Sequence, residues 1–180
     1  PQLAFLAARA PQGPGADRYA LAEVARYRGI LDAFSSDQPY PLLRLAARQL
    51  EQHAPRVARP VLVHGDFRVG NVMFDEAGLT AVLDWELSHV GDPVEDLGWL
   101  CVRTWRFGND ALAAGGLCSR EELVRCYEAA GGDAVDPAAL AWWELFGNWK
   151  WAIICRMQAA RHRAGKRPDV ELAAIGRRVA

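Results

Sequence analysis

The segments His-Gly-Asp-Phe-Arg-Val-Gly-Asn (residues 64–71) and Leu-Asp-Trp-Glu (residues 83–86) contain the pattern that decides the fold of this chain. Together they place two carboxylates and one carboxamide in a fixed order, as Asp66, Asn71 and Asp84. Fragments such as His-Gly-Asp and Leu-Asp-Trp are common as turns, because Gly and Asp satisfy local backbone geometry without any chemistry. Their combination at one spacing is far more specific than either fragment alone.

Three short apolar runs around these side chains predict strands. They are Val61–Val63, Val72–Phe74 and Leu79–Leu83, the last two joined by a turn at residues 75–78. Asp66 and Asn71 then lie on a loop between strands, and Asp84 follows the third strand. A hairpin made from the last two strands would fold back and bring Asp84 towards Asn71.

These three side chains suit phosphoryl transfer. The reaction needs an acceptor for the proton of the attacking hydroxyl and oxygen ligands that hold Mg²⁺ against the phosphates. Asp66 suits the first task, and Asn71 and Asp84 suit the second. The order Asp-x-x-x-x-Asn, followed by a second Asp after the next strands, matches the catalytic and metal-binding loops of kinases, with Gly65 standing where protein kinases carry Arg.

Together with Gly-Asp-Pro-Val-Glu-Asp-Leu-Gly at residues 91–98, these segments resemble the aminoglycoside phosphotransferase family of small-molecule kinases. Within that family the chain is most similar to the branch that includes the kinase-like domains of acyl-CoA dehydrogenase fusions. The resemblance implies that Asp66 is the catalytic base or orients the hydroxyl. It further implies that Asn71 and Asp84 bind Mg²⁺ and the cofactor phosphates, and that ATP or GTP is the donor.

Other polar residues near these segments have structural interpretations. Asp92, directly before Pro93, is expected to cap the next helix, and acidic residues at this place, such as Asp96, often bond backbone amides. His64 is expected to hold the shape of the loop by hydrogen bonding, with a second acid or base as the alternative. For Arg68 two roles stay open: contact with phosphate or substrate, or an ion pair with a neighbouring acid.

The rest of the chain is mainly helical in pattern. Apolar residues that recur every three to four positions predict helices over residues 21–34 and 42–53. Ser119 begins a capping box, and the helix after it should end at Gly131. Asp136 and Pro137 should start a long helix that runs to residue 162.

Two groups of residues in this part have alternative interpretations. The tryptophans of the long helix either pack against the hairpin or form a wall of the acceptor pocket; they are Trp142, Trp143, Trp149 and Trp151. Arg103 and Arg106 either meet an anionic group of the substrate or are ordinary surface arginines.

A complete kinase also needs a glycine-rich loop over the phosphates and a strand-borne lysine. The only lysines, Lys150 and Lys166, follow the loop, and the upstream glycine cluster at residues 13–15 lacks the spacing of a phosphate cradle. We therefore predict an α+β, predominantly helical fold: residues 1–180 form a single carboxy-terminal lobe of a protein-kinase-like fold, with a small β-hairpin carrying the catalytic and metal loops. The amino-terminal nucleotide lobe is missing in cis, so we expect a fragment of a longer protein, inactive alone, rather than a naturally truncated one.

Composition narrows the class of protein. The chain has 180 residues, of which 51% are hydrophobic, and 21 basic residues nearly balance 22 acidic ones. This balance leaves no excess of basic residues of the kind that nucleic-acid binding needs. No apolar run reaches the ~20 residues that a membrane span requires. The four cysteines form no Cys-x-x-Cys pair, which favours a reduced, cytoplasmic compartment.

The predicted function is transfer of the γ-phosphoryl group of ATP, or GTP, to a hydroxyl of a small molecule. The alternative is a non-catalytic binding or scaffolding module that retains the kinase-like fold. A metal-dependent hydrolase fits less well, because the histidine-rich ligand sets usual for such sites are absent from the sequence.

Overall fold

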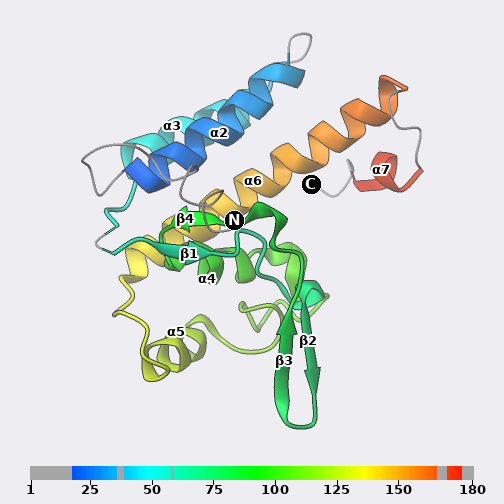
Figure 1. Cartoon of the computed structure of the whole chain (residues 1–180). Helices are drawn as coiled ribbons and strands as arrows, with labels where there is room; N and C mark the ends of the chain where they lie inside the picture. The colour runs from blue at the N-terminus through cyan, green and yellow to red at the C-terminus, as the bar shows by residue number, and fades with distance from the viewer. Residues whose placement is uncertain (1–17, 36–38, 58, 166–169, 176–180) are drawn as a thin grey trace, which may run out of the picture.

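Helices make up most of the structure, and two small antiparallel sheets lie among them (Figure 1). The computed structural model describes residues 18–35, 39–57, 59–165 and 170–175; Lys166 and the glycine cluster at residues 13–15 lie outside this part. In chain order the elements are α2 (Arg18–Phe34), α3 (Pro41–Gln52), β1 (Val61–Val63), β2 (Val72–Asp75), β3 (Gly78–Val82), β4 (His89–Gly91), α4 (Val94–Leu100), α5 (Arg120–Ala129), α6 (Pro137–Arg163) and α7 (Val170–Ile175). The predicted class, α+β with helices dominant, is confirmed. None of the described helices combines the length and apolarity needed to cross a membrane.

The long helix α6 is the element against which α2, α3 and α4 pack. Asp136 caps its first turn, because the Asp136 carboxylate accepts a hydrogen bond from the Ala138 amide at 2.9 Å and Pro137 takes the first helical position. Figure 1 shows α2 and α3 lying together along one side of α6, and the strands on the opposite side of α6. The predicted start of α5 is also confirmed, since the Ser119 hydroxyl accepts a bond from the Glu122 amide at 3.2 Å.

Three tryptophans of α6 belong to the main hydrophobic core. Trp142 and Trp149 each donate the indole N–H to a backbone carbonyl of α3, at 3.1 and 2.8 Å. Trp143 donates to the Asp92 carboxylate at 2.8 Å. All three are almost completely buried. The packing interpretation therefore holds for them, although they pack against α3 and α4 instead of the hairpin.

The contact between α4 and α6 depends on a glycine. A Cβ atom added to Gly98 would lie 2.5 Å from the Cβ atom and 2.7 Å from the carbonyl carbon of Trp143. Only a residue without a side chain allows the two helix backbones to approach this closely. The approach fixes the position of α4, whose side chains reach the loop that follows β1.

The two sheets are each two-stranded. β2 and β3 form the predicted hairpin, with Val72 opposite Val82 and a register irregularity after Met73; in Figure 1 the hairpin projects away from the helices. β1 matches the predicted strand and pairs antiparallel with β4, so that Val63 lies opposite His89. The sequence pattern missed β4, because this strand is short and contains a single apolar residue.

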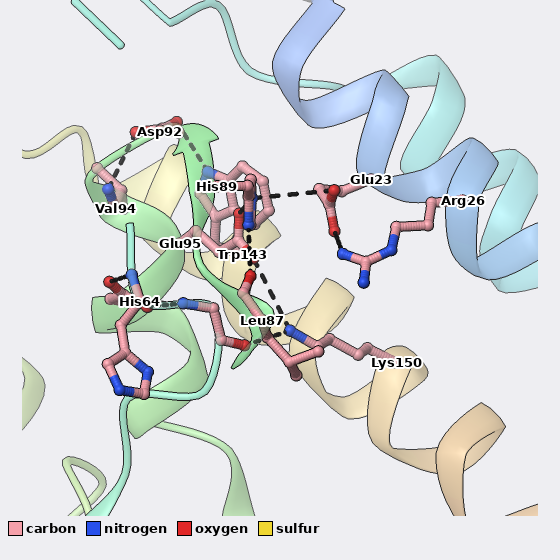
Figure 2. Close-up of polar contacts among 12 residues, drawn as sticks. Glu23, Arg26, His64, Leu87, His89, Asp92, Val94, Glu95, Trp143 and Lys150 are labelled. Atoms are coloured by element: carbon pink, nitrogen blue, oxygen red, sulfur yellow. Dashed lines mark hydrogen bonds and ion pairs between the residues drawn. The ribbon is translucent and has the colours of Figure 1, made fainter. Parts of the chain in front are cut away.

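A chain of buried charged side chains joins four elements (Figure 2). His89 of β4 lies between two carboxylates, with its Nε2 atom 3.1 Å from Glu95 of α4 and 3.9 Å from Glu23 of α2. Glu23 also pairs with Arg26 at 3.3 Å. Lys150 of α6 completes the chain at 3.8 Å from the other oxygen of Glu95. Such charges are costly to bury unless they are paired, so the chain ties α2, β4, α4 and α6 to one arrangement.

His89 carries a positive charge in this network of buried side chains. Burial alone would lower its pKa, but the hydrogen bond and charge of Glu95, with a further contribution from Glu23, raise the pKa to about 9. The ring therefore donates from both nitrogens at neutral pH, from Nδ1 to the Leu87 carbonyl at 3.0 Å and from Nε2 to Glu95. Glu23, His89 and Glu95 have the spacing of a metal site, but the imidazolium already supplies the positive charge between the carboxylates.

Gly98→Ala should destabilise the chain by about 1–3 kcal/mol, because the added methyl group overpacks a contact between two helix backbones. Chemical denaturation measures the change. Gly29→Ala is the matched control: Gly29 lies in α2, and an added Cβ would meet nothing within 4 Å. This control should be neutral or stabilise by up to about 1 kcal/mol. Equal effects from both substitutions would contradict the packing argument.

The stability of the chain should depend on His89 protonation. Because the folded pKa of about 9 lies above the ordinary value of 6.5, the stabilisation is fully present below about pH 6.5 and is lost as pH rises through about 9. At about 1.4 kcal/mol per pKa unit, the loss should be on the order of 2–4 kcal/mol. Denaturation at several pH values should show this slope in the parent chain and not in His89→Gln. The exposed His53→Gln should keep the slope, and an unchanged slope in His89→Gln would contradict the assignment.

Candidate active site

The loop of residues 64–71, called here the Asp66 loop, follows β1 and makes a sharp turn at Gly65. Gly65 has φ of 78°, and an added Cβ would lie 2.5 Å from the Leu87 carbonyl oxygen. This left-handed backbone conformation favours glycine. The two successive amides at the turn bind one carboxylate group. The amides of His64 and Gly65 donate to the two carboxylate oxygens of Asp96, at 2.7 and 2.9 Å. α4 therefore holds the turn through one side chain.

The two acidic residues predicted to be structural have the expected roles. Asp96 bonds backbone amides, as just described, and Asp92 accepts a hydrogen bond from the Val94 amide at 3.0 Å at the start of α4. Removal from water raises the pKa of both carboxyls, and the hydrogen bonds that each accepts act in the opposite direction.

His64 links the Asp66 loop to the end of the hairpin. Its Nδ1 atom accepts a hydrogen bond from the Asp66 amide at 3.1 Å, and its Nε2 atom donates to the Leu83 carbonyl at 2.7 Å. The ring is buried, and these partners define a neutral imidazole with its proton on Nε2. The prediction that His64 holds the shape of the loop is confirmed.

Three donors hold the Asp66 carboxylate. One oxygen accepts a hydrogen bond from the indole N–H of Trp99 at 2.7 Å. The other accepts from the Asn71 amide group at 2.8 Å and from Arg68 Nε at 3.3 Å. Arg68 thus pairs with a neighbouring acid, one of its two predicted roles, and its guanidinium lies 5.0 Å from the centre of the Trp105 ring. The carboxylate is fixed in orientation before any ligand arrives.

The hairpin brings the backbone of Asn71 against that of Leu83, the residue before Asp84. The Leu83 amide donates to the backbone carbonyl of Asn71 at 2.8 Å, which continues the pairing of β2 and β3. Asp84 follows directly after Leu83. Asn71 is buried, and its NH₂ group is used by the carbonyl and carboxylate of Asp66. No donor among the described residues binds its amide oxygen, which can therefore act as a ligand.

Asp84 differs from the other acids of the site. It is exposed and has a left-handed backbone, with φ of 68° and ψ of 52°. Within the described part of the chain no hydrogen bond or ion pair engages its carboxylate. A non-glycine residue in this conformation carries strain, and such strain is concentrated at functional sites. An amide oxygen together with a free carboxylate is the kind of ligand set that Mg²⁺ prefers.

The arginines considered for an anionic substrate group are both engaged elsewhere. Arg103 pairs with Asp110 at 2.8 Å on the surface. Arg106 donates to the Cys101 carbonyl at 2.8 Å and pairs with Glu144 of α6 at 3.1 Å. Arg106 therefore fastens the segment after α4 to α6.

Two further residues contact the Asp66 loop and were missed by the sequence pattern. Trp99 of α4 binds the Asp66 carboxylate, and Lys150 of α6 donates to the Gly65 carbonyl at 2.6 Å. The only sequence signal for Lys150 was its position between Trp149 and Trp151, where a charged side chain interrupts an apolar helix.

Indole N–H groups recur at the polar points around this site. Trp143 binds Asp92 in the same way as Trp99 binds Asp66. A tryptophan fills space like an apolar residue and supplies one donor at its edge. It can satisfy a carboxylate without bringing a second charge into the interior. Trp99 and Trp143 satisfy Asp66 and Asp92 in this way.

Comparison with known proteins identifies the family of the chain. The model of the phosphotransferase enzyme family matches residues 1–143. Acyl-CoA dehydrogenase family member 10 of Mus musculus is 45% identical over 64 residues, which are 34% of this chain and 6% of that protein. Acyl-CoA dehydrogenase family member 11 of Gallus gallus is 36% identical over 90 residues, 49% of this chain and 11% of that protein. The chain thus spans only a small part of the curated relatives that it matches.

Solved structures share the fold over nearly the whole chain. A protein of Ralstonia eutropha assigned to the aminoglycoside phosphotransferases is 26% identical with a TM-score of 0.76, and the match covers 99% of this chain and 56% of that one. A macrolide 2'-phosphotransferase type I, 22% identical with a TM-score of 0.54, shares the fold over 92% of this chain and 48% of its own. The predicted resemblance to aminoglycoside phosphotransferases and to the acyl-CoA dehydrogenase branch is confirmed. Because the family match extends over most of its residues, the chain belongs to the phosphotransferase enzyme family.

Proposed function

We propose that the chain is the catalytic and substrate lobe of a small-molecule kinase that moves the γ-phosphoryl group of ATP, or of GTP, to a hydroxyl. The observation that carries this proposal is the contrast between two carboxylates on neighbouring loops. Asp66 is held by Trp99, Asn71 and Arg68, whereas the Asp84 carboxylate is exposed. The first arrangement suits a group that must be oriented, and the second suits a group that must bind a cation.

In the proposed mechanism Asp66 orients the acceptor hydroxyl and takes its proton. Each carboxylate oxygen has more than one lone-pair site, so the bonds from Trp99 and Asn71 leave acceptor capacity for the hydroxyl. Both bonds come from neutral groups, and they fix the carboxylate without neutralising it. The Arg68 guanidinium, at 3.3 Å, adds a positive charge beside the ionised form of Asp66.

Mg²⁺ would be held by the Asn71 amide oxygen and the Asp84 carboxylate. The fit rests on the use of the Asn71 NH₂ group by Asp66, which leaves only oxygen to face a cation. Bound Mg²⁺ would neutralise charge on the nucleotide phosphates and keep them in line with the acceptor.

The nucleotide cradle is proposed to lie in a separate lobe of a longer protein, so that the chain alone transfers no phosphate. Lys150 does not replace the strand-borne lysine of a kinase, because it is buried and binds the Gly65 carbonyl. The match to 56% of the Ralstonia eutropha chain supports a larger protein. A cytoplasmic location is supported by the cysteines of the described residues, which form no disulfide. Burial raises the pKa of the Cys101 thiol to about 12, which disfavours the reactive thiolate.

Asp66→Asn in the full-length protein should lower kcat by about 10²–10⁴-fold, the usual contribution of a positioned general base. The measurement is phosphoryl transfer from labelled ATP to a panel of hydroxylated small molecules, including hydroxyacyl thioesters. Folding should be preserved, because an asparagine oxygen still accepts the Trp99 hydrogen bond.

Asp110→Asn is the matched control for Asp66→Asn, since Asp110 only pairs with Arg103 on the surface. It should leave kcat unchanged. If the parent protein phosphorylates no acceptor and Asp66→Asn alters no measured property, the enzyme proposal fails and the non-catalytic binding module takes its place.

Asp84→Asn should raise the Mg²⁺ concentration needed for half-maximal transfer by about tenfold or more, because the variant loses a charged ligand. The measurement is activity against Mg²⁺ concentration at saturating ATP. Asp75→Asn is the matched control. Asp75 lies at the exposed turn of the hairpin, where its carboxylate accepts a hydrogen bond from the nearby Ala77 amide. This variant should behave like the parent. An unchanged Mg²⁺ requirement in Asp84→Asn would remove this residue from the metal site.

A further inference from the structure

Lys150 occupies an unusual position for a lysine. It lies in the middle of α6 with 1% of its surface exposed. Its ammonium group donates to the Gly65 carbonyl at 2.6 Å and lies over the Trp99 ring at 4.4 Å from the centroid. Trp99 is the residue whose indole N–H binds the Asp66 carboxylate. The ammonium therefore touches both the backbone that carries Asp66 and a side chain that holds it.

The hydrogen bond fixes one particular peptide unit. The Gly65 carbonyl belongs to the peptide that joins Gly65 to Asp66, and the N–H of the same peptide donates to His64 Nδ1 at 3.1 Å. Lys150 and His64 thus hold the two ends of this unit, and Asp96 holds the preceding amides. The plane of the Gly65–Asp66 peptide sets the direction in which the Asp66 side chain leaves the backbone.

The position of Lys150 favours the hydrogen bond to the Gly65 carbonyl over the ion pair with Glu95. The nearest oxygen of Glu95 is 3.8 Å away, and this Oε1 atom has no hydrogen-bond partner among the described residues. A lysine that served only to neutralise Glu95 would close that distance. Instead Glu95 compensates the ammonium charge from a distance, while His89 binds its other oxygen. Burial would lower the pKa of Lys150, but Tyr27, Glu95 and Glu23 outweigh it and raise the pKa, so the group stays charged.

We propose that Lys150 is a positioning residue of the phosphotransfer site. From α6 it fixes the Gly65–Asp66 peptide, and through that peptide it sets the orientation of the Asp66 carboxylate. This inference rests on the proposed function, because it assigns Lys150 a part in orienting the base. It differs from the cradle lysine of kinases, since Lys150 contacts the loop backbone and not the nucleotide.

The test separates positioning from stability with three variants of the full-length protein. Lys150→Met removes the donor and one of the two positive charges near Glu95, so both Tm and kcat should fall. The double variant Lys150→Met/Glu95→Gln is compared with Glu95→Gln, which carries the same loss at His89. Tm of the double variant should not fall below that of Glu95→Gln, while kcat should be about ten- to hundredfold lower. KM for ATP should stay within twofold of the parent in both Lys150 variants, because the nucleotide contacts are unaltered.

Ile153→Ala is the matched control on the same helix. Ile153 is buried in the main core and takes no part in the hydrogen bond between Lys150 and Gly65, so the variant should lower Tm with kcat unchanged. Equal kcat in the double variant and in Glu95→Gln would overturn the proposal. An equal loss of kcat in Ile153→Ala would overturn it as well, because general destabilisation of α6 would then explain the effect.

Hydrogen exchange of the amides at residues 64–66 tests the same inference without any turnover. The double variant should exchange these amides at least about tenfold faster than Ile153→Ala, since the peptide loses its anchor on one side. Unchanged exchange would overturn the positioning role. If the parent protein shows no phosphoryl transfer, the proposed function fails, yet the exchange rates still decide whether Lys150 holds the loop.

Discussion

The bond between the Asp96 carboxylate and two successive amides of the Asp66 loop is the interaction on which the rest of the site depends. The left-handed turn at Gly65 directly follows these two amides and leads the chain on to Asp66. The bond requires α4 to be in the right place, and the close approach at Gly98 fixes α4 on α6. The packing of α4 on α6 thereby sets the position of the Asp66 loop. Any substitution that separates the helices acts on Asp66 without touching it.

The parts of the fold that could be predicted are those specified by neighbouring residues. β1, the hairpin and the caps of α5 and α6 follow from short local patterns, and so do the structural roles of His64 and Asp96 within their family context. The chemical roles of Asp66, Asn71 and Asp84 stay predictions. β4 escaped prediction because its stability comes from pairing with β1 and not from its own apolar content.

The contacts of Trp99 and Lys150 could not be predicted, because residues far apart in the chain create them. Lys150 lies on α6 and binds a carbonyl that precedes it by 85 positions. Helical periodicity places it among tryptophans, where a lysine is normally excluded, but gives no indication of its partner. A charged residue on the buried side of a helix indicates an acceptor elsewhere in the fold, and only the structure identifies that acceptor as a backbone carbonyl.

The site thus combines rigid and free groups in a way that follows from their surroundings. Asp66 lies where α4, α6 and the loop converge, so donors from each of them reach the residue or its backbone. Asp84 follows β3, where the hairpin returns to the body of the protein; its backbone is left-handed and the residue is exposed. A base must be oriented before its substrate arrives, whereas a cation ligand must stay unpaired until the cation does. Under the proposed function, the helical body meets the first requirement through Asp66, and the exposed segment after β3 meets the second through Asp84.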